Sequence, residues 1–251
     1  MCYSTYNCVS YEDEDEMLKV IDMILYAPSS PSTQVPPLQT GDRLSRKEFE
    51  RRYEVMPEEK KAELLEGVVY VVSSVRAKYH ARPHAVIINW LGNYWLATPG
   101  TDLLDNSTVR LDPTNEPQPD VLLRLEDGNS LIDRDEYVDG APELVVEISA
   151  SSTSRDLKTK FNVYRRNGVQ EYLIWETESQ EILWYSLQAG DYVLLSADDR
   201  GIVCSQVFPG LWLDAPALLS GEFATVMACG QQGLQTPEHT AFKQKLASSQ
   251  Q

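Results

Sequence analysis

The sequence has no long apolar run, few cysteines and a shortage of positive charge. No stretch approaches the roughly 18 consecutive apolar residues that a membrane-spanning helix needs. The N-terminus lacks the basic segment and apolar core of a secretory signal. The four cysteines (Cys2, Cys8, Cys204 and Cys229) are scattered, and no pair has metal-ligand spacing. These absences predict no membrane association and a reduced, cytoplasmic location.

Acidic residues outnumber basic ones, with 38 Asp and Glu against 22 Lys and Arg, which gives a formal net charge of −16. Such a surface repels nucleic acid over long range, so binding it would require a locally basic groove or divalent cations. Hydrophobic residues make up 42% of the chain, enough for a sizeable core. The charge therefore counts against nucleic-acid binding without excluding it.

Composition divides the chain into three predicted segments. Residues 1–40 are predicted to be a disordered tail, because they contain the acidic run EDEDE and a Pro- and Ser-rich stretch without periodicity. Met23, inside this tail, is an alternative first residue of the natural protein. Residues 41–222 are predicted to form the folded domain, and residues 223–251 a helical extension.

The middle segment mixes helical and strand signals, which predicts an α+β fold with a mixed β-sheet flanked by helices. The last three strands are expected to form a meander, and the strand at 143–149 has apolar residues on both faces, which is typical of a central strand. Helices are expected after Ser45, at 84–98 and at 155–167, and strands at 68–74, 108–112, 119–125, 143–149, 171–176, 181–187 and 191–197.

Glu147 stands out because it lies inside the apolar run 144–148. A carboxylate in such a place is costly unless a positive group lies against it. Asp120 opens another apolar strand, and if the two strands are neighbours, both carboxylates can bind one hard cation such as Mg²⁺. The sequence therefore predicts a metal site at Asp120 and Glu147, in which the cation neutralises Glu147.

A lysine on the following helix is the third candidate. A rotation of about 100° per residue places Leu157, Phe161 and Tyr164 on one stripe that faces the sheet. Lys160 borders this stripe, whereas Lys158 lies farther from it on the other side. Lys160 is therefore the preferred group to orient a water molecule or to stabilise charge developing on phosphorus, and Lys158 is the alternative.

These motifs resemble those of a large bacterial family of restriction-endonuclease-like proteins in the PD-(D/E)XK nuclease superfamily. The resemblance spans roughly residues 43–219 and is carried by Pro119-Asp120, by GAPELVVEIS, by STSRDLxxKxxxY and by NGVQEYLIW. It implies a restriction-endonuclease-like fold that hydrolyses phosphodiester bonds in DNA with Mg²⁺, or with Mn²⁺ in its place. The superfamily lysine would stand two residues after the second acid, where this chain has Ser149, and Lys160 matches a displaced lysine.

The resemblance also implies roles for two further residues. Glu66 matches an upstream helix glutamate, as a further ligand or hydrogen-bond partner, although an exposed acid at a helix-to-strand turn fits equally well. His84 matches a histidine at the edge of the site, where it would contact substrate. Apart from the resemblance, Arg165 on the predicted helix is a candidate to contact phosphate, although exposed helix arginines are common. Pro83 argues against one helix through both histidines, so His80 is read as a surface residue.

Two other functions also fit the sequence. A catalytically inactive nuclease-fold module for binding or assembly would suit the acidic surface and the lack of a basic DNA-binding element. A metal-dependent phosphoesterase acting on small substrates would need the same metal site. A homodimer is an option, because nucleases of this superfamily often pair to cut both strands.

Overall fold

The computed structural model describes residues 35–57, 60–71, 77–150 and 155–249. The chain divides into a unit of residues 1–36 and a compact unit of residues 37–251. Residues 1–34 of the predicted disordered tail (residues 1–40), which include the alternative start at Met23, lie outside the described residues. Leu38, in the last part of the predicted tail, is buried in the compact unit.

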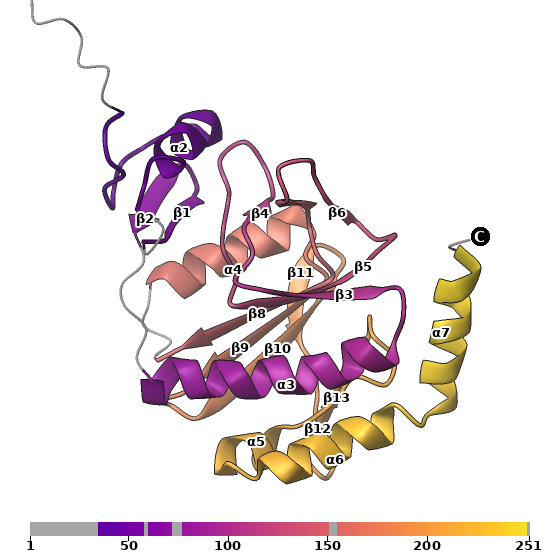
Figure 1. Ribbon diagram of the computed structural model, residues 1–251. Coiled ribbons are helices and arrows are strands. Elements are labelled where there is room, and N and C mark those ends of the chain that lie inside the picture. The colour runs from indigo at the N-terminus through magenta and orange to yellow at the C-terminus, as the bar shows by residue number, and fades with distance from the viewer. Residues whose placement is uncertain (1–34, 58–59, 72–76, 151–154, 250–251) are drawn as a thin grey trace, which may run out of the picture. The chain divides into compact units, whose positions relative to one another are not determined.

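A six-stranded mixed sheet lies at the centre of the compact unit (Figure 1). Its order is β11-β10-β9-β8-β5-β3, and within it only β8 and β9 pair in parallel. The predicted α+β fold with a central strand at 143–149 is confirmed, whereas β3 was not predicted. The strands are β3 (Thr101–Asp105), β5 (Val121–Leu125), β8 (Leu144–Ser149), β9 (Glu171–Glu176), β10 (Glu181–Gln188) and β11 (Asp191–Leu194).

Helix α3 (Arg82–Ala97) covers one face of this sheet and α4 (Arg155–Asn167) covers the other (Figure 1). Successive strand residues point to opposite faces. Val146 of β8 therefore packs in the same cluster as Trp90 of α3, whereas Val145 packs with Leu157 of α4. Glu147 shares the face of Val145, and for this reason its carboxylate meets α4 instead of solvent.

Helix α4 is the crossover that the parallel β8–β9 pair requires. It ends at Asn167, and the following Gly168 has a φ of +86°, the left-handed conformation that closes a helix. The predicted stripe is present: Leu157 and Tyr164 are buried and Phe161 is half-buried against the same cluster. Helix α4 thus packs its apolar face on the sheet, and Lys160 lies next to that face.

A π-helical turn, η1 (Ala77–Ala81), leads directly into α3, so one helical path runs through both His80 and His84. The expectation that Pro83 separates the histidines is wrong. Pro83 stands at the start of α3, directly after the π-helical turn, and does not interrupt the path between the two histidines.

A small N-terminal layer consists of α2 (Arg46–Tyr53) and a β1–β2 hairpin formed by Ala62–Leu65 and Val68–Val71. The hairpin turn is Glu66-Gly67, and both residues have positive φ, 53° and 71°. Two such residues between paired strands form the tight turn that matches strand twist. Strand β1 was not predicted, because its segment was read as part of a helix.

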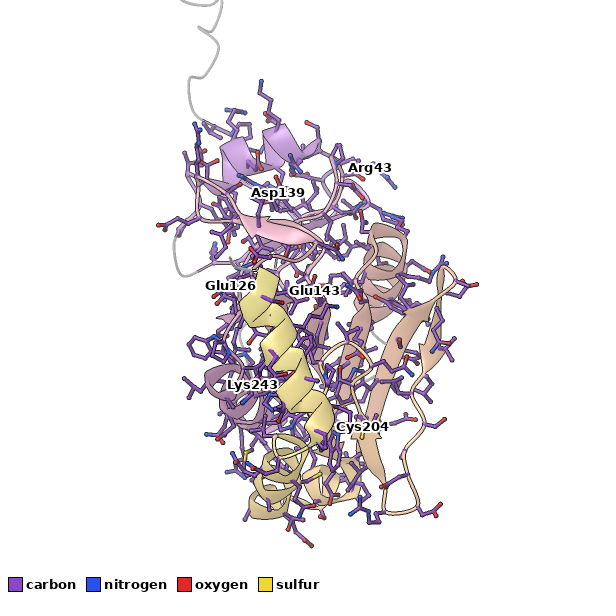
Figure 2. The ribbon with its side chains drawn as sticks, turned by 90° about the vertical axis from the view of Figure 1, so that its right-hand side faces the viewer. Arg43, Glu126, Asp139, Glu143, Cys204 and Lys243 are labelled. Atoms are coloured by element: carbon purple, nitrogen blue, oxygen red, sulfur yellow. The ribbon has the colours of Figure 1, made fainter. Side chains whose placement is uncertain are left out.

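The remaining elements extend the body on either side of the sheet. A three-stranded sheet is formed by β4 (Val109–Arg110), β6 (Ser130–Ile132) and β7 (Val138–Gly140), and a two-stranded one by β12 (Ile202–Cys204) and β13 (Trp212–Asp214). The C-terminal helices are α5 (Ala215–Ser220), α6 (Phe223–Gly233) and α7 (Pro237–Ser249). Figure 2 shows α7, which carries Lys243, crossing the side that faces the viewer. Among the described helices, none combines the length and the hydropathy required to traverse a bilayer.

Candidate active site

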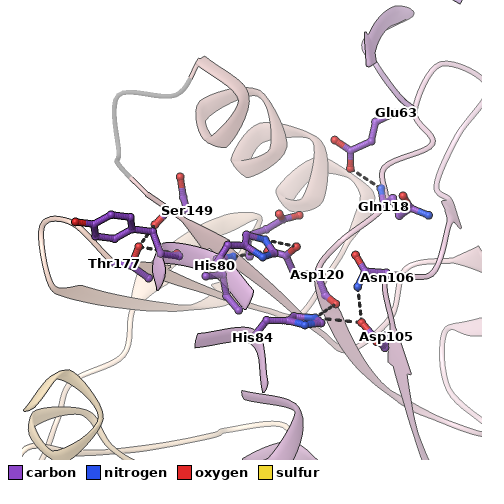
Figure 3. Close-up of polar contacts among 12 residues, drawn as sticks. Glu63, His80, His84, Asp105, Asn106, Gln118, Asp120, Ser149 and Thr177 are labelled. Carbon is purple, nitrogen blue, oxygen red and sulfur yellow. Dashed lines mark hydrogen bonds and ion pairs between the residues drawn. The ribbon is translucent and has the colours of Figure 1, made fainter. Parts of the chain in front are cut away.

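Asp120 stands immediately before β5, at the edge of the central sheet. The antiparallel register pairs Val121 with Val146, so Asp120 lies beside Glu147 of the neighbouring strand. Its Oδ2 accepts a hydrogen bond of 2.7 Å from the main-chain N–H of Ile148, and its Oδ1 lies 2.9 Å from His80 Nε2 (Figure 3). Two elements other than its own strand therefore fix this carboxylate.

Glu147 is only 6% exposed, and the positive charge against it comes from α4. The Lys160 Nζ lies 3.0 Å from Glu147 Oε1 and 3.1 Å from Oε2, and the Tyr164 hydroxyl donates to Oε1 at 2.9 Å. Lys160 and Tyr164 are one helical turn apart, so both reach the same carboxylate. Lys160 of the chain itself thus lies against Glu147, while Lys158 is exposed.

Glu63 of β1 is a third buried carboxylate at this site, and the sequence analysis missed it. Its Oε1 lies 2.9 Å from Lys160 Nζ and accepts a hydrogen bond of 2.6 Å from the main-chain N–H of Gln118 (Figure 3). Lys160 therefore bridges Glu63 and Glu147. The signal that could have revealed Glu63 is the Glu66-Gly67 pair, which marks a two-residue hairpin turn and makes the preceding residues a strand.

Two residues predicted for the site have other partners. Glu66, at the hairpin turn, is half-exposed and its Oε1 lies 2.7 Å from Arg166 Nη1. Arg165 donates to the Gly190 carbonyl and to Asp191 Oδ1, both at 2.9 Å, and so ties α4 to the β10–β11 turn. The structure brings neither side chain to Glu147, because Glu66 belongs to a turn and Arg165 projects from a different side of α4 than Lys160.

Both histidines contact Asp120 (Figure 3). The bond to Asp120 raises the pKa of His80 above its ordinary value. Burial raises the pKa of Asp120, but the bonds from His80 and Ile148 outweigh it and hold that pKa below its usual range. His84 Nε2 lies 3.0 Å from the Asp120 carbonyl oxygen and 3.1 Å from Asp105 Oδ1. The reading of His80 as a surface residue is therefore wrong, since its ring is part of the site.

The donor chemistry of this site fits a hard divalent cation. Asp120 and Glu147 present carboxylate oxygens from adjacent strands, and Mg²⁺ in enzymes is commonly held by one or two carboxylates together with water and substrate phosphate. Across the described ranges, no three His, Cys, Asp or Glu side chains converge into a ready-made metal cage. A cation here would therefore depend on two carboxylates and on the ligands that arrive with the substrate.

The family comparison bears on this arrangement directly. Residues 46–216 match the model of the Uma2 family, described as "Putative restriction endonuclease". The match covers more than half of the chain and includes Glu63, Asp120, Glu147 and Lys160. The chain belongs to the Uma2 family. The resemblance to restriction-endonuclease-like proteins that the motifs indicated is thereby confirmed.

A solved structure shares the fold of this Uma2 chain. It is described as the crystal structure of "a putative nuclease belonging to DUF820 from Anabaena variabilis ATCC 29413". The two chains superpose with a TM-score of 0.57 and 13% sequence identity, over 70% of this chain and 98% of the other. At that identity the likeness shows the fold alone. No curated protein matches this chain.

Proposed function

We propose that this protein is a Mg²⁺-dependent endonuclease that hydrolyses phosphodiester bonds in DNA by attack of water. The observation that supports the proposal best is the position of Lys160, whose ammonium bridges Glu63 and Glu147 beside Asp120. An acidic pair with a lysine at its edge combines the groups that phosphoryl transfer needs, which are a place for a cation and a donor for the developing charge.

Asp120 and Glu147 would hold the cation, with Mn²⁺ as the alternative to Mg²⁺. A bound Mg²⁺ would supply Lewis-acid stabilisation of the negative charge on the phosphoryl oxygens. His80 and Ile148 would keep the Asp120 carboxylate oriented toward the neighbouring strand, as they do in this structure. Tyr164 would do the same for Glu147.

Lys160 would orient the attacking water or donate to a phosphoryl oxygen. Its contact with Glu63 would hold the ammonium in the site when the charge of Glu147 is shared with a cation. In this proposal the lysine of α4 would take the role that the superfamily motif assigns to the position of Ser149. His84, at the edge of the site next to Asp105, would contact the substrate phosphate.

One observation favours the second candidate function, a nuclease fold that binds without cutting. Lys160 lies against both buried carboxylates and offsets one of their two negative charges without a metal ion. A small-substrate phosphoesterase is the third candidate and needs the same cation.

The test is cleavage of supercoiled plasmid and of single-stranded DNA with Mg²⁺ or Mn²⁺, with chelator as the metal-free control. Asp120→Ala, Glu147→Ala and Lys160→Ala are expected to lose the metal-dependent activity, whereas the exposed neighbour Lys158→Ala keeps it. Absence of both cleavage and calorimetric metal binding in the wild type would favour the non-catalytic function. Hydrolysis of nucleotide analogues but not of DNA would favour the phosphoesterase.

A further inference from the structure

A shallow groove of about 560 Å³ runs between α3 and α6, outside the candidate active site. Four of its lining residues, Arg82, Ala85, Val86 and Asn89, follow the helical spacing i, i+3, i+4, i+7 and form one stripe of α3. The opposite wall is the first part of α6, from Phe223 and Ala224 to Met227. The groove is thus lined almost entirely by apolar atoms, and no lining residue is acidic.

The groove has positive charge at one end. Arg82 is exposed and forms no ion pair with any residue in the described part of the chain, whereas Arg46, Arg110, Arg166 and Arg200 all do. Lys78, one turn earlier on the same helical path, is also exposed and also lacks an ion pair within that part. In a chain of net charge −16, two uncompensated cations beside an apolar groove are a favourable local site for an anion.

Helix α3 connects this groove with the active site. His84, which contacts the Asp120 carbonyl, lies about 200° around the helix from Arg82, so the two residues occupy opposite flanks. The distance across the helix is about 10–12 Å. A strand that contacts both His84 and Arg82 must span this distance.

The shape and chemistry of the groove fit a nucleobase. Phe223 is half-buried and lines the groove with an aromatic ring, Met227 and Val86 supply apolar contact, and the Asn89 amide can hydrogen-bond to a base edge. A positively charged path combined with an aromatic platform is the arrangement by which proteins hold single-stranded nucleic acid. A base inside a duplex is stacked and paired, so it cannot enter the groove without leaving the helix.

We propose that the groove between α3 and α6 binds an unpaired nucleobase of the substrate strand, with Arg82 and Lys78 on the adjoining phosphates. This proposal rests on the proposed nuclease function and makes the substrate single-stranded DNA, or a strand that has left its duplex next to the cleavage point. The groove then selects unpaired over paired DNA and does not select a base sequence, because every base has a face that can stack.

The experiment measures binding by fluorescence anisotropy in the presence of Mg²⁺, on a Glu147→Gln background that prevents cleavage. The probes are a labelled thymidylate strand of about 15 nucleotides and a blunt duplex of the same length. Phe223→Ala is expected to weaken strand binding about tenfold and to leave duplex binding unchanged. The matched control is Trp95→Ala, an exposed aromatic on the opposite side of α3, which is expected to change neither.

A second variant keeps the test independent of any damage to packing by the Phe223 change. Arg82→Glu alters only an exposed side chain, and it is expected to weaken strand binding and to flatten its salt dependence. Arg134→Glu, an exposed arginine without an ion pair in the described ranges, makes the same charge change elsewhere and is expected to have a much smaller effect. Equal losses for strand and duplex, or no loss in either groove variant, would overturn the proposal.

The outcomes separate this proposal from the proposed function. If the wild type cleaves DNA and the Phe223→Ala and Arg82→Glu variants cleave it equally well, the groove proposal is overturned and the proposed nuclease function stands. If the groove variants weaken strand binding but the wild type does not cleave DNA with Mg²⁺ or Mn²⁺, the groove proposal is supported and the proposed nuclease function is overturned.

Discussion

The Lys160 ammonium lies 3.0 Å from Glu147 Oε1, so the charge that stabilises a carboxylate of the central strand comes from the crossover helix. Both side chains are nearly inaccessible to solvent, and the same ammonium also contacts Glu63. An ion pair of this kind contributes little net stability compared with an apolar pair, but removing one partner leaves an uncompensated buried charge. The site is therefore a place where single substitutions are costly.

Lys160→Met is expected to lower the free energy of unfolding by about 3–5 kcal/mol, because it leaves Glu63 and Glu147 buried without their cation. Urea unfolding at neutral pH measures this difference. Lys158→Met, on the same helix and exposed, is expected to change it by less than about 0.5 kcal/mol. Similar losses in the two variants would show that the lysine matters for the helix and not for the carboxylates.

Glu63→Gln is expected to reduce metal-dependent DNA cleavage by at least about tenfold, since it removes a charge that holds Lys160 in the site. Glu66→Gln, three residues later, is expected to retain wild-type activity, because its carboxylate pairs with Arg166 at the surface. Initial rates of plasmid nicking compare the two. A larger loss for Glu66→Gln would mean that the surface pair moves into the site when substrate binds.

Tyr164→Phe removes a buried hydrogen bond to a carboxylate and is expected to lower the free energy of unfolding by about 1.5–3 kcal/mol. It is also expected to weaken calorimetric Mg²⁺ binding several-fold, because Glu147 loses one of the groups that orient it. Tyr192→Phe is the control, since it loses a bond of the same length to a neutral main-chain carbonyl, that of Val169. It should cost less stability and leave metal binding unchanged.

His239 gives the protein a pH dependence that does not involve the active site. Its ring is fully buried, with Nε2 at 2.9 Å from Thr98 Oγ1 and Nδ1 at 2.9 Å from the Leu234 carbonyl. Burial lowers the pKa of this histidine in the folded state. The unfolded chain then binds a proton more readily, so the contribution to stability is complete above about pH 6.5 and is lost as the pH falls below that value.

Urea unfolding between about pH 5 and pH 8 checks this dependence. The wild type is expected to lose stability toward the acid end of the range, and His239→Gln is expected to lose less over the same interval. If the free energy of unfolding falls equally with pH in the two proteins, the acid sensitivity comes from other groups.

Local periodicity was enough to predict much of the fold. The apolar strand at 143–149, the meander and the sheet-facing stripe of α4 follow from residues close in sequence, and the same spacing placed Lys160 next to the stripe. Strand β3 and strand β1 were missed. The first has only Leu103 and Leu104 as apolar residues, and the second was masked by a segment whose Glu and Leu residues also suit a helix.

The site was harder to predict, because its partners come from distant segments. Glu63 lies almost one hundred residues before Lys160, and no local pattern links the two. His80 was dismissed because Pro83 was expected to break a helix, but a π-helical turn before α3 carries the helical path past this proline. The spacing on α4 predicted that Lys160 lies next to the face that packs on the sheet. Its contacts with two carboxylates depend on how the hairpin and the sheet pack, which the spacing does not indicate.

The family match ends at residue 216, yet the same core continues beyond it. Val226 and Cys229 of α6 are buried, Phe242 of α7 packs on Phe208, and Tyr94 of α3 lies against the His239 ring. A chain shortened to the matched span would therefore keep every proposed catalytic side chain but expose the apolar flank of α3. The proposed catalytic residues therefore all lie within the matched span, whereas the folded core also includes the C-terminal helices.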